Sequence, residues 1–337
     1  MNNKQVFFLS GVLAVLFFMS ILTGRINISF REILALFSSI LHNGDLSGVS
    51  APYQLVFWWI RLPRCIMAVV VGAGLSVSGA VYQALFRNPL VSPDILGVSA
   101  GCTFGAALGL ILLPLNSFLF IQIMAFVFGI AAVSLAMGIA RLIAVKPVIV
   151  LVLSGMVVMS LFNALLMVVK YFSDPYEELP NIVFWIMGSL TRVSWQDLYT
   201  AIPITGTGLV VFMLLRFRLN ILSLGDLQAK SLGMNPALFR TLLIGASSFI
   251  VASTVATCGQ ICWIGLIIPH MARTLAGPEH ENMLPVTALL GAIFMVAADT
   301  AARSISSAEI PVGIITALTG APVFGFLLYK NRGSGWL

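Results

Sequence analysis

The chain has 337 residues, of which 59% are hydrophobic and 9% are charged, with a formal net charge of +6 and a mean hydropathy of +1.04. A soluble domain carries about 25% charged residues, so this chain has too few charges to cover a water-facing surface. Its basic residues lie between apolar runs rather than in one patch, which argues against nucleic-acid binding and is typical of the loops of a multi-pass membrane protein.

Apolar runs along the chain predict an all-α bundle of about ten membrane-spanning helices, because about 20 apolar residues cross the hydrocarbon as a helix. Strands are not expected, since the runs lack the alternation of a membrane barrel. The first run follows Lys4 and ends without a small-x-small site, so we expect an anchor rather than a cleaved signal peptide. The predicted spans are 5–24, 62–86, 94–112, 117–140, 147–172, 198–216, 240–258, 263–276, 283–303 and 311–330.

The charges between these spans favour a cytoplasmic location for both termini. With a cytoplasmic N-terminus, the cytoplasmic side receives eleven basic and four acidic residues, and the outer side receives the other seven basic and eight acidic ones. This asymmetry obeys the positive-inside rule. The cytoplasmic charges are Lys4, Arg87, Arg141, Lys146, Arg216, Arg218, Lys230, Arg240, Arg273, Lys330 and Arg332, with Asp94, Asp226, Glu279 and Glu281.

The second span is preceded by segment 58–64, whose sequence is WWIRLPR. Because the following run spans by itself, Arg61 and Arg64 are expected at the outer interface beside a tryptophan belt. Simple anchoring is one explanation. The positive-inside rule disfavours outer arginines, so docking of a partner with acidic groups is the alternative.

Two predicted helices carry small residues three or four apart, a spacing that lets helix backbones approach closely in a membrane. The residues are Gly72, Ser76 and Gly79 on the second helix, with the related face Gly101, Gly105 and Gly109 on the third. The pattern predicts a tightly packed bundle and indicates nothing about function.

The most polar cytoplasmic segment is LGDLQAKSLGMNP at 224–236, between the sixth and seventh spans. It has a helical opening, a glycine stop and a proline restart. An ordinary loop is one interpretation, and a short helix that projects to meet a cytoplasmic subunit is the other.

Catalytic and metal motifs are missing from the sequence. There is no Gly-Lys dipeptide for a nucleotide-phosphate loop, no HExxH, and no ligand spacing among His42, His270 and His280. Cys258 and Cys262 are expected on one helical face, where packing is favoured over metal or redox work. The spans also hold few ionisable groups; Asp299 and Arg303, one turn apart, are expected to pair. The energy source for transport is therefore expected outside this chain.

Several motifs spread in order over the chain resemble those of the FecCD family, the permeases for vitamin B12 and iron chelates. They are RLPR at 61–64, GAGLSVSGAVYQALFRNPL at 72–90, GVS at 97–99, GLIIPH at 265–270, Ala-Asp followed by an arginine at 298–303, and GAPVF at 320–324. The resemblance implies one transmembrane permease domain over 1–337 with the type II ABC importer fold, multi-pass in the bacterial inner membrane. It also implies a homodimer, two cytoplasmic ATPase subunits and a periplasmic binding protein, with no cofactor, metal or catalytic residue in this chain.

The resemblance also implies residue roles. Helices 147–172 and 311–330 would line the translocation pathway, with Ser154, Met156, Met159, Ser160, Asn163 and Met167 on the first and Thr316 and Thr319 on the second. Segment 224–239 would be the coupling segment, with Leu227, Lys230, Leu232, Gly233 and Met234 at the ATPase contact. Arg61, Arg64 and Arg303 match arginines that meet acidic residues on the two lobes of the binding protein.

The cargo stays open at this point. The family carries ferric siderophores, haem, cobalamin and, in one branch, molybdate or tungstate, and segment 171–180 is more similar to the iron-complex and oxyanion members than to the B12 carrier. The main alternative from another class is an ion-coupled secondary transporter that works without an ATPase. An intramembrane enzyme lacks any nucleophile–base or metal constellation in the sequence.

Overall fold

The computed structural model describes residues 3–24, 31–32, 35–36, 50–112, 118–143, 147–306 and 308–330, and within these ranges it is helical without a strand. Seven helices are long and apolar enough to cross a membrane, and three shorter apolar helices accompany them in the described part of the chain. These ten helices correspond to the ten predicted spans, so the prediction of an all-α membrane bundle is confirmed.

Most predicted boundaries lie within a few residues of the observed ones. In chain order the elements are α1 (Asn3–Leu22), α3 (Ala51–Leu55), η1 (Val56–Arg61), α4 (Leu62–Phe86), η2 (Pro93–Leu96), α5 (Val98–Leu112), α6 (Phe118–Leu142), α7 (Pro147–Phe172), α8 (Glu178–Ile186), α9 (Trp195–Leu224), α10 (Asp226–Ser231), α11 (Pro236–Cys258), α12 (Ile264–Ala276), α13 (His280–Ile305) and α14 (Val312–Lys330). The sequence interpretation did not include α8, whose nine residues are too few to span.

The small-residue faces place helix backbones in direct contact. A methyl group at Gly72 would overlap the backbone of Gly291 on α13, and one at Gly79 would overlap the carbonyl of Gly265 on α12. Between them, the Ser76 hydroxyl donates to the carbonyl of Thr287 at 3.0 Å. The glycines of α5 face the backbone of α6 in the same way. The predicted close packing is confirmed, and it makes α4 the centre of the bundle.

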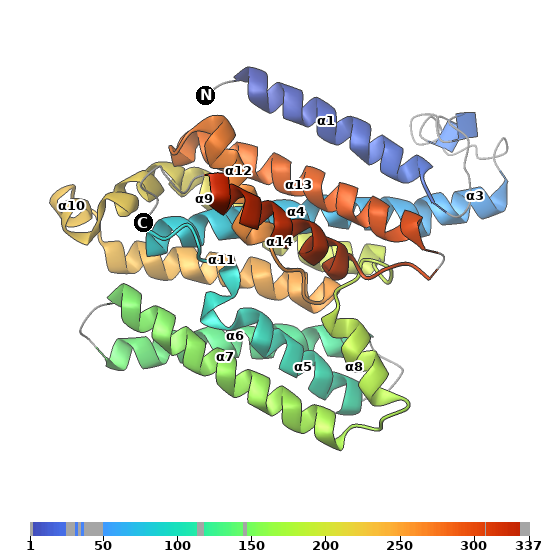
Figure 1. The fold of residues 1–337 in the computed structure, drawn as a ribbon, viewed down its shortest axis with the longest axis horizontal. Helices are drawn as coiled ribbons and strands as arrows, with labels where there is room; N and C mark the ends of the chain where they lie inside the picture. The colour runs from blue at the N-terminus through green and yellow to red at the C-terminus, as the bar shows by residue number, and fades with distance from the viewer. Residues whose placement is uncertain are drawn as a thin grey trace.

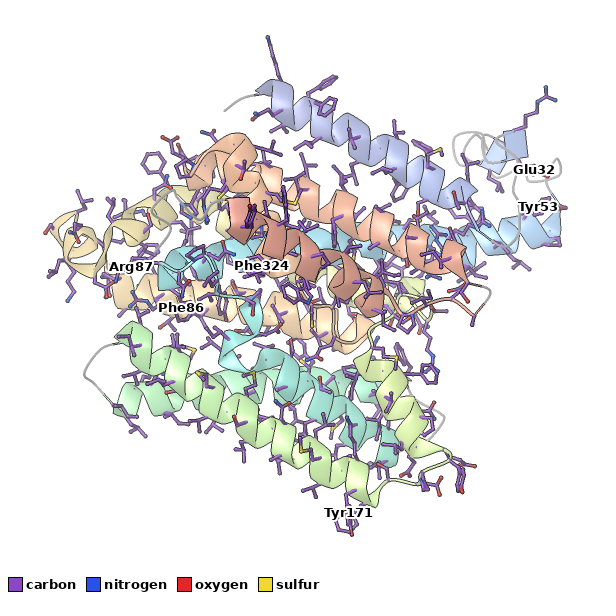
Figure 2. The ribbon with its side chains drawn as sticks, viewed as in Figure 1. Glu32, Tyr53, Phe86, Arg87, Tyr171 and Phe324 are labelled. Carbon is purple, nitrogen blue, oxygen red and sulfur yellow. The ribbon has the colours of Figure 1, made fainter. Side chains whose placement is uncertain are left out.

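The helices lie roughly parallel, with α1 along one edge against α13 and with α5, α6, α7 and α8 grouped on the other side (Figure 1). The short helix α10 lies at one end, and α1 begins and α14 ends toward that end. We call it the α10 end and the opposite end the α8 end. Arg87 lies toward the α10 end and Tyr171 lies at the α8 end (Figure 2). Of the predicted cytoplasmic charges, Lys146 and Arg332 lie outside the described residues.

The chain does not stay at the α10 end after α4. Residues 91–97 return into the bundle: Val91 and Leu96 are buried, and the Ile95 carbonyl lies against Gly155 in the middle of α7. Asp94 borders a small void that it shares with Leu75, near the midpoint of α4. Its predicted position among the cytoplasmic charges is therefore wrong, because the sequence placed Asp94 at a helix start and gave no sign that this segment re-enters.

Candidate functional site

A buried ion-pair network lies at the α8 end, where α4 begins and α13 ends. Arg64 donates from Nε to both carboxylate oxygens of Asp299, at 2.9 and 3.1 Å, and from Nη1 to Glu309 at 2.9 Å. Arg303, one turn after Asp299, lies 3.5 Å from the same carboxylate, which confirms the predicted pair. Arg64 and Asp299 are only 4% and 1% exposed, so this network is internal to the subunit.

Two of the arginines also close the end of α1. The Arg61 guanidinium donates to the carbonyls of Ile21 and Leu22, and Arg303 donates to the carbonyl of Ser20 at 2.7 Å. The last carbonyls of a helix have no partner within the helix, and cations there also interact favourably with the helix dipole. Arg61 and Arg303 therefore tie α1 to the rest of the bundle.

The three arginines that the sequence assigned to docking are all buried in this structure. Arg61, Arg64 and Arg303 are 4%, 4% and 6% exposed, and all three donate to groups of this chain. In this structure none presents its guanidinium on the surface. Sequence reasoning found the Asp299–Arg303 pair from its spacing, but it missed Glu309, which is 245 residues from Arg64 and carries no local signal.

The opposite arrangement occurs at the α10 end, in segment 224–239. Leu227 and Leu232 are 78% and 60% exposed, and Lys230 and Gly233 also lie on the surface. Gly233 has a φ of +73°, and a methyl group there would meet no atom within 4 Å. The predicted short helix is confirmed as α10. Four of the five predicted contact residues point outward, whereas Met234 is buried and holds the segment to the bundle.

Segment 224–239 is attached to the bundle at several points. Arg240 at the start of α11 forms an ion pair with Asp226 at 2.8 Å. The Met234 amide donates to the Ala229 carbonyl at 3.0 Å, and Ala229 is fully buried. Gly225 lies close to the side chain of Arg87 at the end of α4. Segment 224–239 is therefore in contact with the ends of α4, α9 and α11.

The predicted pathway residues separate into two groups. Ser154 and Thr316 are buried inside the subunit and donate to carbonyls of their own helices, so in this structure neither reaches a surface that could line a pathway. The others lie on exposed or half-buried faces of α7 and α14. They are Met156, Met159, Ser160, Asn163, Met167 and Thr319. Their assignment stays a prediction.

The cysteines do not share a helical face. The last residue of α11 is Cys258, and Cys262 lies in the turn that follows, so the expectation of one face is wrong. Cys258 is buried and Cys262 is exposed. Gly259, with a φ of +71°, ends the helix between them.

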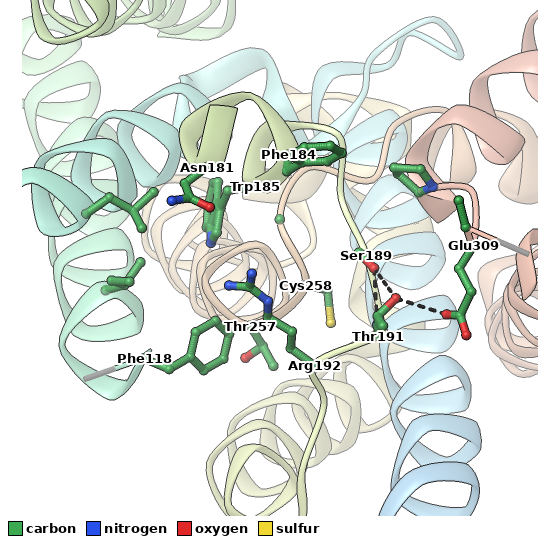
Figure 3. A pocket seen from close by; sticks show the side chains of 15 residues that line it. Phe118, Asn181, Phe184, Trp185, Ser189, Thr191, Arg192, Thr257, Cys258 and Glu309 are labelled. Atoms are coloured by element: carbon green, nitrogen blue, oxygen red, sulfur yellow. Dashed lines mark hydrogen bonds between the residues drawn. The ribbon is translucent and has the colours of Figure 1, made fainter. Parts of the chain in front are cut away.

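A pocket of about 370 Å³ opens at the α8 end between α6, α8 and the end of α11. Phe118, Phe184 and Trp185 supply aromatic walls, while Asn181, Ser189, Thr191, Arg192 and Glu309 supply polar groups (Figure 3). The Thr191 hydroxyl bonds to Ser189 at 2.7 Å and donates to Glu309 at 3.3 Å. The pocket thus adjoins the buried network through Glu309. It was not predicted, because its residues come from five separate stretches of the chain.

Asp94 is the one deep carboxylate that the sequence interpretation placed elsewhere. It accepts a hydrogen bond from Ser99 and lies beside the first turn of α12. The void that it borders has a volume of about 20 Å³, enough for a single water molecule.

Comparison with known proteins identifies the family. Residues 12–330 match the model of the FecCD transport family. The molybdate import system permease MolB of Haemophilus influenzae is 40% identical over 98% of this chain and 97% of its own length. A probable iron chelatin transport permease of Helicobacter pylori is 42% identical over 87% of each chain. The cobalamin import permease BtuC of Halobacterium salinarum is 39% identical over 83% of this chain and 75% of its own length.

A solved structure has the same fold over nearly the whole chain. It is described as an inward-facing conformation of a metal-chelate type ABC transporter, and it superposes with a TM-score of 0.87 at 39% identity over 97% of this chain and 99% of that one. This chain is a multi-pass membrane protein that belongs to the FecCD transport family.

Proposed function

We propose that this chain is the membrane permease subunit of a binding-protein-dependent ABC importer that carries a metal-containing solute. The permease would work as a homodimer with two cytoplasmic ATPase subunits and a periplasmic binding protein. ATP would be hydrolysed by the partner subunits, and this chain would supply the path across the inner membrane.

Segment 224–239 is the observation that carries this proposal. Leu227 and Leu232, which are 78% and 60% exposed, lie in a polar segment after the end of α9, where no other described part of the subunit covers them. Exposed apolar side chains with a polar surround mark a surface that another protein covers. The segment is also joined to α4, α9 and α11, so a partner bound there could move the bundle.

The orientation follows from this assignment. If segment 224–239 meets a cytoplasmic ATPase, the α10 end faces the cytoplasm, and with it the start of α1 and the end of α14 (Figure 1). The α8 end, with the pocket and the ion-pair network, then faces the periplasm. The positive-inside count agrees with this arrangement.

The cargo class rests on the relatives, which are named for molybdate, iron chelatin and cobalamin import. The exposed methionines and polar residues of α7 suit a path that adapts to solutes of different shape. Selection among an iron complex, haem, cobalamin and a molybdate or tungstate oxyanion would then be made by the binding protein.

Docking by Arg61, Arg64 and Arg303 is part of the proposal, with a condition that the structure adds. Because these guanidinium groups are buried and bonded within the subunit, acidic groups of a binding protein could reach them only if the network around Asp299 opened. On docking, the arginines would release their partners within the subunit and bind acidic groups of the binding protein. Replacing each arginine with glutamate should weaken docking in a salt-sensitive way, and unchanged docking by folded variants would refute the role.

The direct test is uptake by proteoliposomes that contain the permease, its ATPase and its binding protein. We expect ATP-dependent accumulation of cargo and its loss in Gly233→Val, while membrane insertion is retained. Gly138→Ala is the matched control, because Gly138 is exposed on α6 and also has no atom near its added methyl group. Equal coupling of ATP hydrolysis to uptake in both variants would remove segment 224–239 from the mechanism.

One observation favours the alternative, an ion-coupled transporter. Asp94 is a carboxylate within the bundle, and such groups in spans are typical of proton or cation relays. Asp94→Asn separates the two functions: an ABC permease should keep ATP-driven uptake, whereas an ion-coupled carrier should lose uptake driven by a proton or sodium gradient. Uptake against a gradient with neither ATPase nor binding protein present would overturn the proposal.

A further inference from the structure

The pocket at the α8 end contains a cation that the network beside it does not use. Arg192 lines the pocket, is exposed, and makes no hydrogen bond or ion pair with any described residue. In Figure 3 its guanidinium extends into the space between Phe118 and the Asn181–Trp185 side of α8. A guanidinium has five donors in a planar fork that matches carboxylate and phosphate oxygens.

The carboxylates around Arg192 are bonded to other groups. Glu309 is the only acidic residue among the described lining, and its carboxylate already accepts from Arg64 at 2.9 Å and from Thr191 at 3.3 Å. The nearby carboxylate of Asp197 accepts from Gln122 and from the backbone and hydroxyl of Ser194. Both carboxylates are thus engaged elsewhere, and Arg192 keeps its donors for a ligand.

The base of the pocket is rigid. The Ser189 amide donates to the Cys258 carbonyl at 2.7 Å, and the Gly313 amide donates to the Gly188 carbonyl at 3.3 Å. At Gly259 and Gly313 a methyl group would overlap the carbonyls of Trp185 and Met187, so only glycine allows these three segments to meet. Because the walls are held by backbone contacts, a ligand would pay little to order them.

We propose that this pocket binds an oxyanion through Arg192, with the side-chain amide of Asn181 as a further donor, since only one of its two N–H groups is used by the Glu177 carbonyl. The ligand class is a phosphate, molybdate or carboxylate group, which the guanidinium would hold by paired hydrogen bonds. The volume of about 370 Å³ also leaves room for an apolar portion beside Phe184 and Trp185. The same chemistry could be supplied by a free anion or by the phosphate of a lipid headgroup.

The binding test needs the permease alone and so does not depend on the proposed function. Purified protein in phosphatidylcholine nanodiscs is titrated with sodium molybdate and with sodium phosphate at constant ionic strength, and tryptophan emission is followed. Trp185 lines the pocket, so we expect a saturable change that disappears in Trp185→Phe. Arg192→Gln should weaken the apparent affinity about tenfold or more, as expected when a charged hydrogen-bond donor is removed.

Lys170→Gln is the control, since Lys170, in the last turn of α7, is a cation at the same end of the bundle and does not line the pocket. It should titrate like the unaltered protein. A second arm compares nanodiscs of phosphatidylcholine with nanodiscs that contain phosphatidylglycerol, without added anion. If emission depends on the anionic lipid in the unaltered protein but not in Arg192→Gln, and free anions have no effect, the ligand is a headgroup.

Two outcomes would overturn the proposal. One is the absence of any Trp185-dependent change with molybdate, phosphate or anionic lipid. The other is an equal response in Arg192→Gln and the unaltered protein, which would show that the response does not involve this guanidinium.

Discussion

The two ends of the bundle differ in whether the residues assigned to partner contact are exposed or buried. At the α10 end, segment 224–239 turns Leu227, Lys230 and Leu232 outward and leaves Gly233 open. At the α8 end, Arg61, Arg64 and Arg303 turn inward and bond to Asp299, Glu309 and the last carbonyls of α1. In the sequence both regions are polar segments beside an apolar run, and both were assigned to partner contact. Only at the α10 end does the structure leave most of the assigned residues uncovered.

The difference shows that a charged residue beside a span can either bond to groups within the subunit or remain exposed for a partner. A helix end surrounded by other helices must satisfy its carbonyls from within the protein, because water does not reach them. Arginine is suited to this, since one guanidinium reaches several acceptors at once. Partner contact instead needs side chains that the subunit leaves uncovered. We therefore expect changes at the α8 end to affect stability and changes at the α10 end to affect coupling.

The largest loss of stability should follow Arg64→Ala. This variant would leave Asp299 buried with only Arg303, whose guanidinium is 3.5 Å away. Breaking a buried pair by removing one partner costs about 3–5 kcal/mol. Thermal unfolding in detergent measures the loss, with Lys170→Ala at the same end as the control, for which a change within about 0.5 kcal/mol is expected. A similar transition temperature in both variants would mean that the network contributes little.

The next largest effect should come from the backbone junction under the pocket. In Gly313→Ala the methyl group would overlap the Met187 carbonyl, and such overpacking costs about 1–3 kcal/mol. Gly325→Ala on the same helix is the control, because no atom lies within 4 Å of its methyl group. Unfolding of the two variants should differ in midpoint. If Gly313→Ala is as stable as Gly325→Ala, the three segments are not held as closely as described.

At the α10 end, Gly233→Val should lower stability less than Arg64→Ala does, but it should reduce ATP-coupled uptake more. A β-branched residue at a φ of +73° is strained by about 1–2 kcal/mol. Gly233→Asn tolerates this backbone conformation and separates strain from contact. If the exposed surface meets an ATPase, both variants should reduce uptake coupled to ATP hydrolysis. If Gly233→Asn couples ATP hydrolysis to uptake fully, coupling depends on the backbone conformation at this position and not on the open space beside it.

The smallest effect is expected for the ion pair between Asp226 and Arg240. The Asp226 side chain is 34% exposed although that of Arg240 is only 10% exposed, so water partly screens the pair, and we expect a contribution of about 1 kcal/mol. Asp226→Asn should therefore shift the unfolding midpoint slightly, and the shift should shrink in high salt because the interaction is screened. A loss as large as that of Arg64→Ala would remove the contrast between the two ends.

Much of the fold could be predicted from local features of the chain. Segments 62–86 and 147–172 match α4 and α7 at both ends, since hydropathy and proline position mark them. The glycine stop and proline restart around Gly233 marked α10 and the start of α11. What was missed is short or re-entrant: α8 has nine residues, and 91–97 has too little length to show its path by hydropathy.

The sequence by itself determined the number of spans, the close packing at Gly72 and Gly79, and the family, because these depend on composition and on residues near one another in the chain. Only the tertiary structure decided that Arg64 belongs to Asp299 and Glu309, which lie 235 and 245 residues away. It also decided that Asp94 enters the bundle and that Arg192 reaches a pocket. These facts depend on which helices meet, and side chains far apart in the chain pair only once packing has brought their helices together.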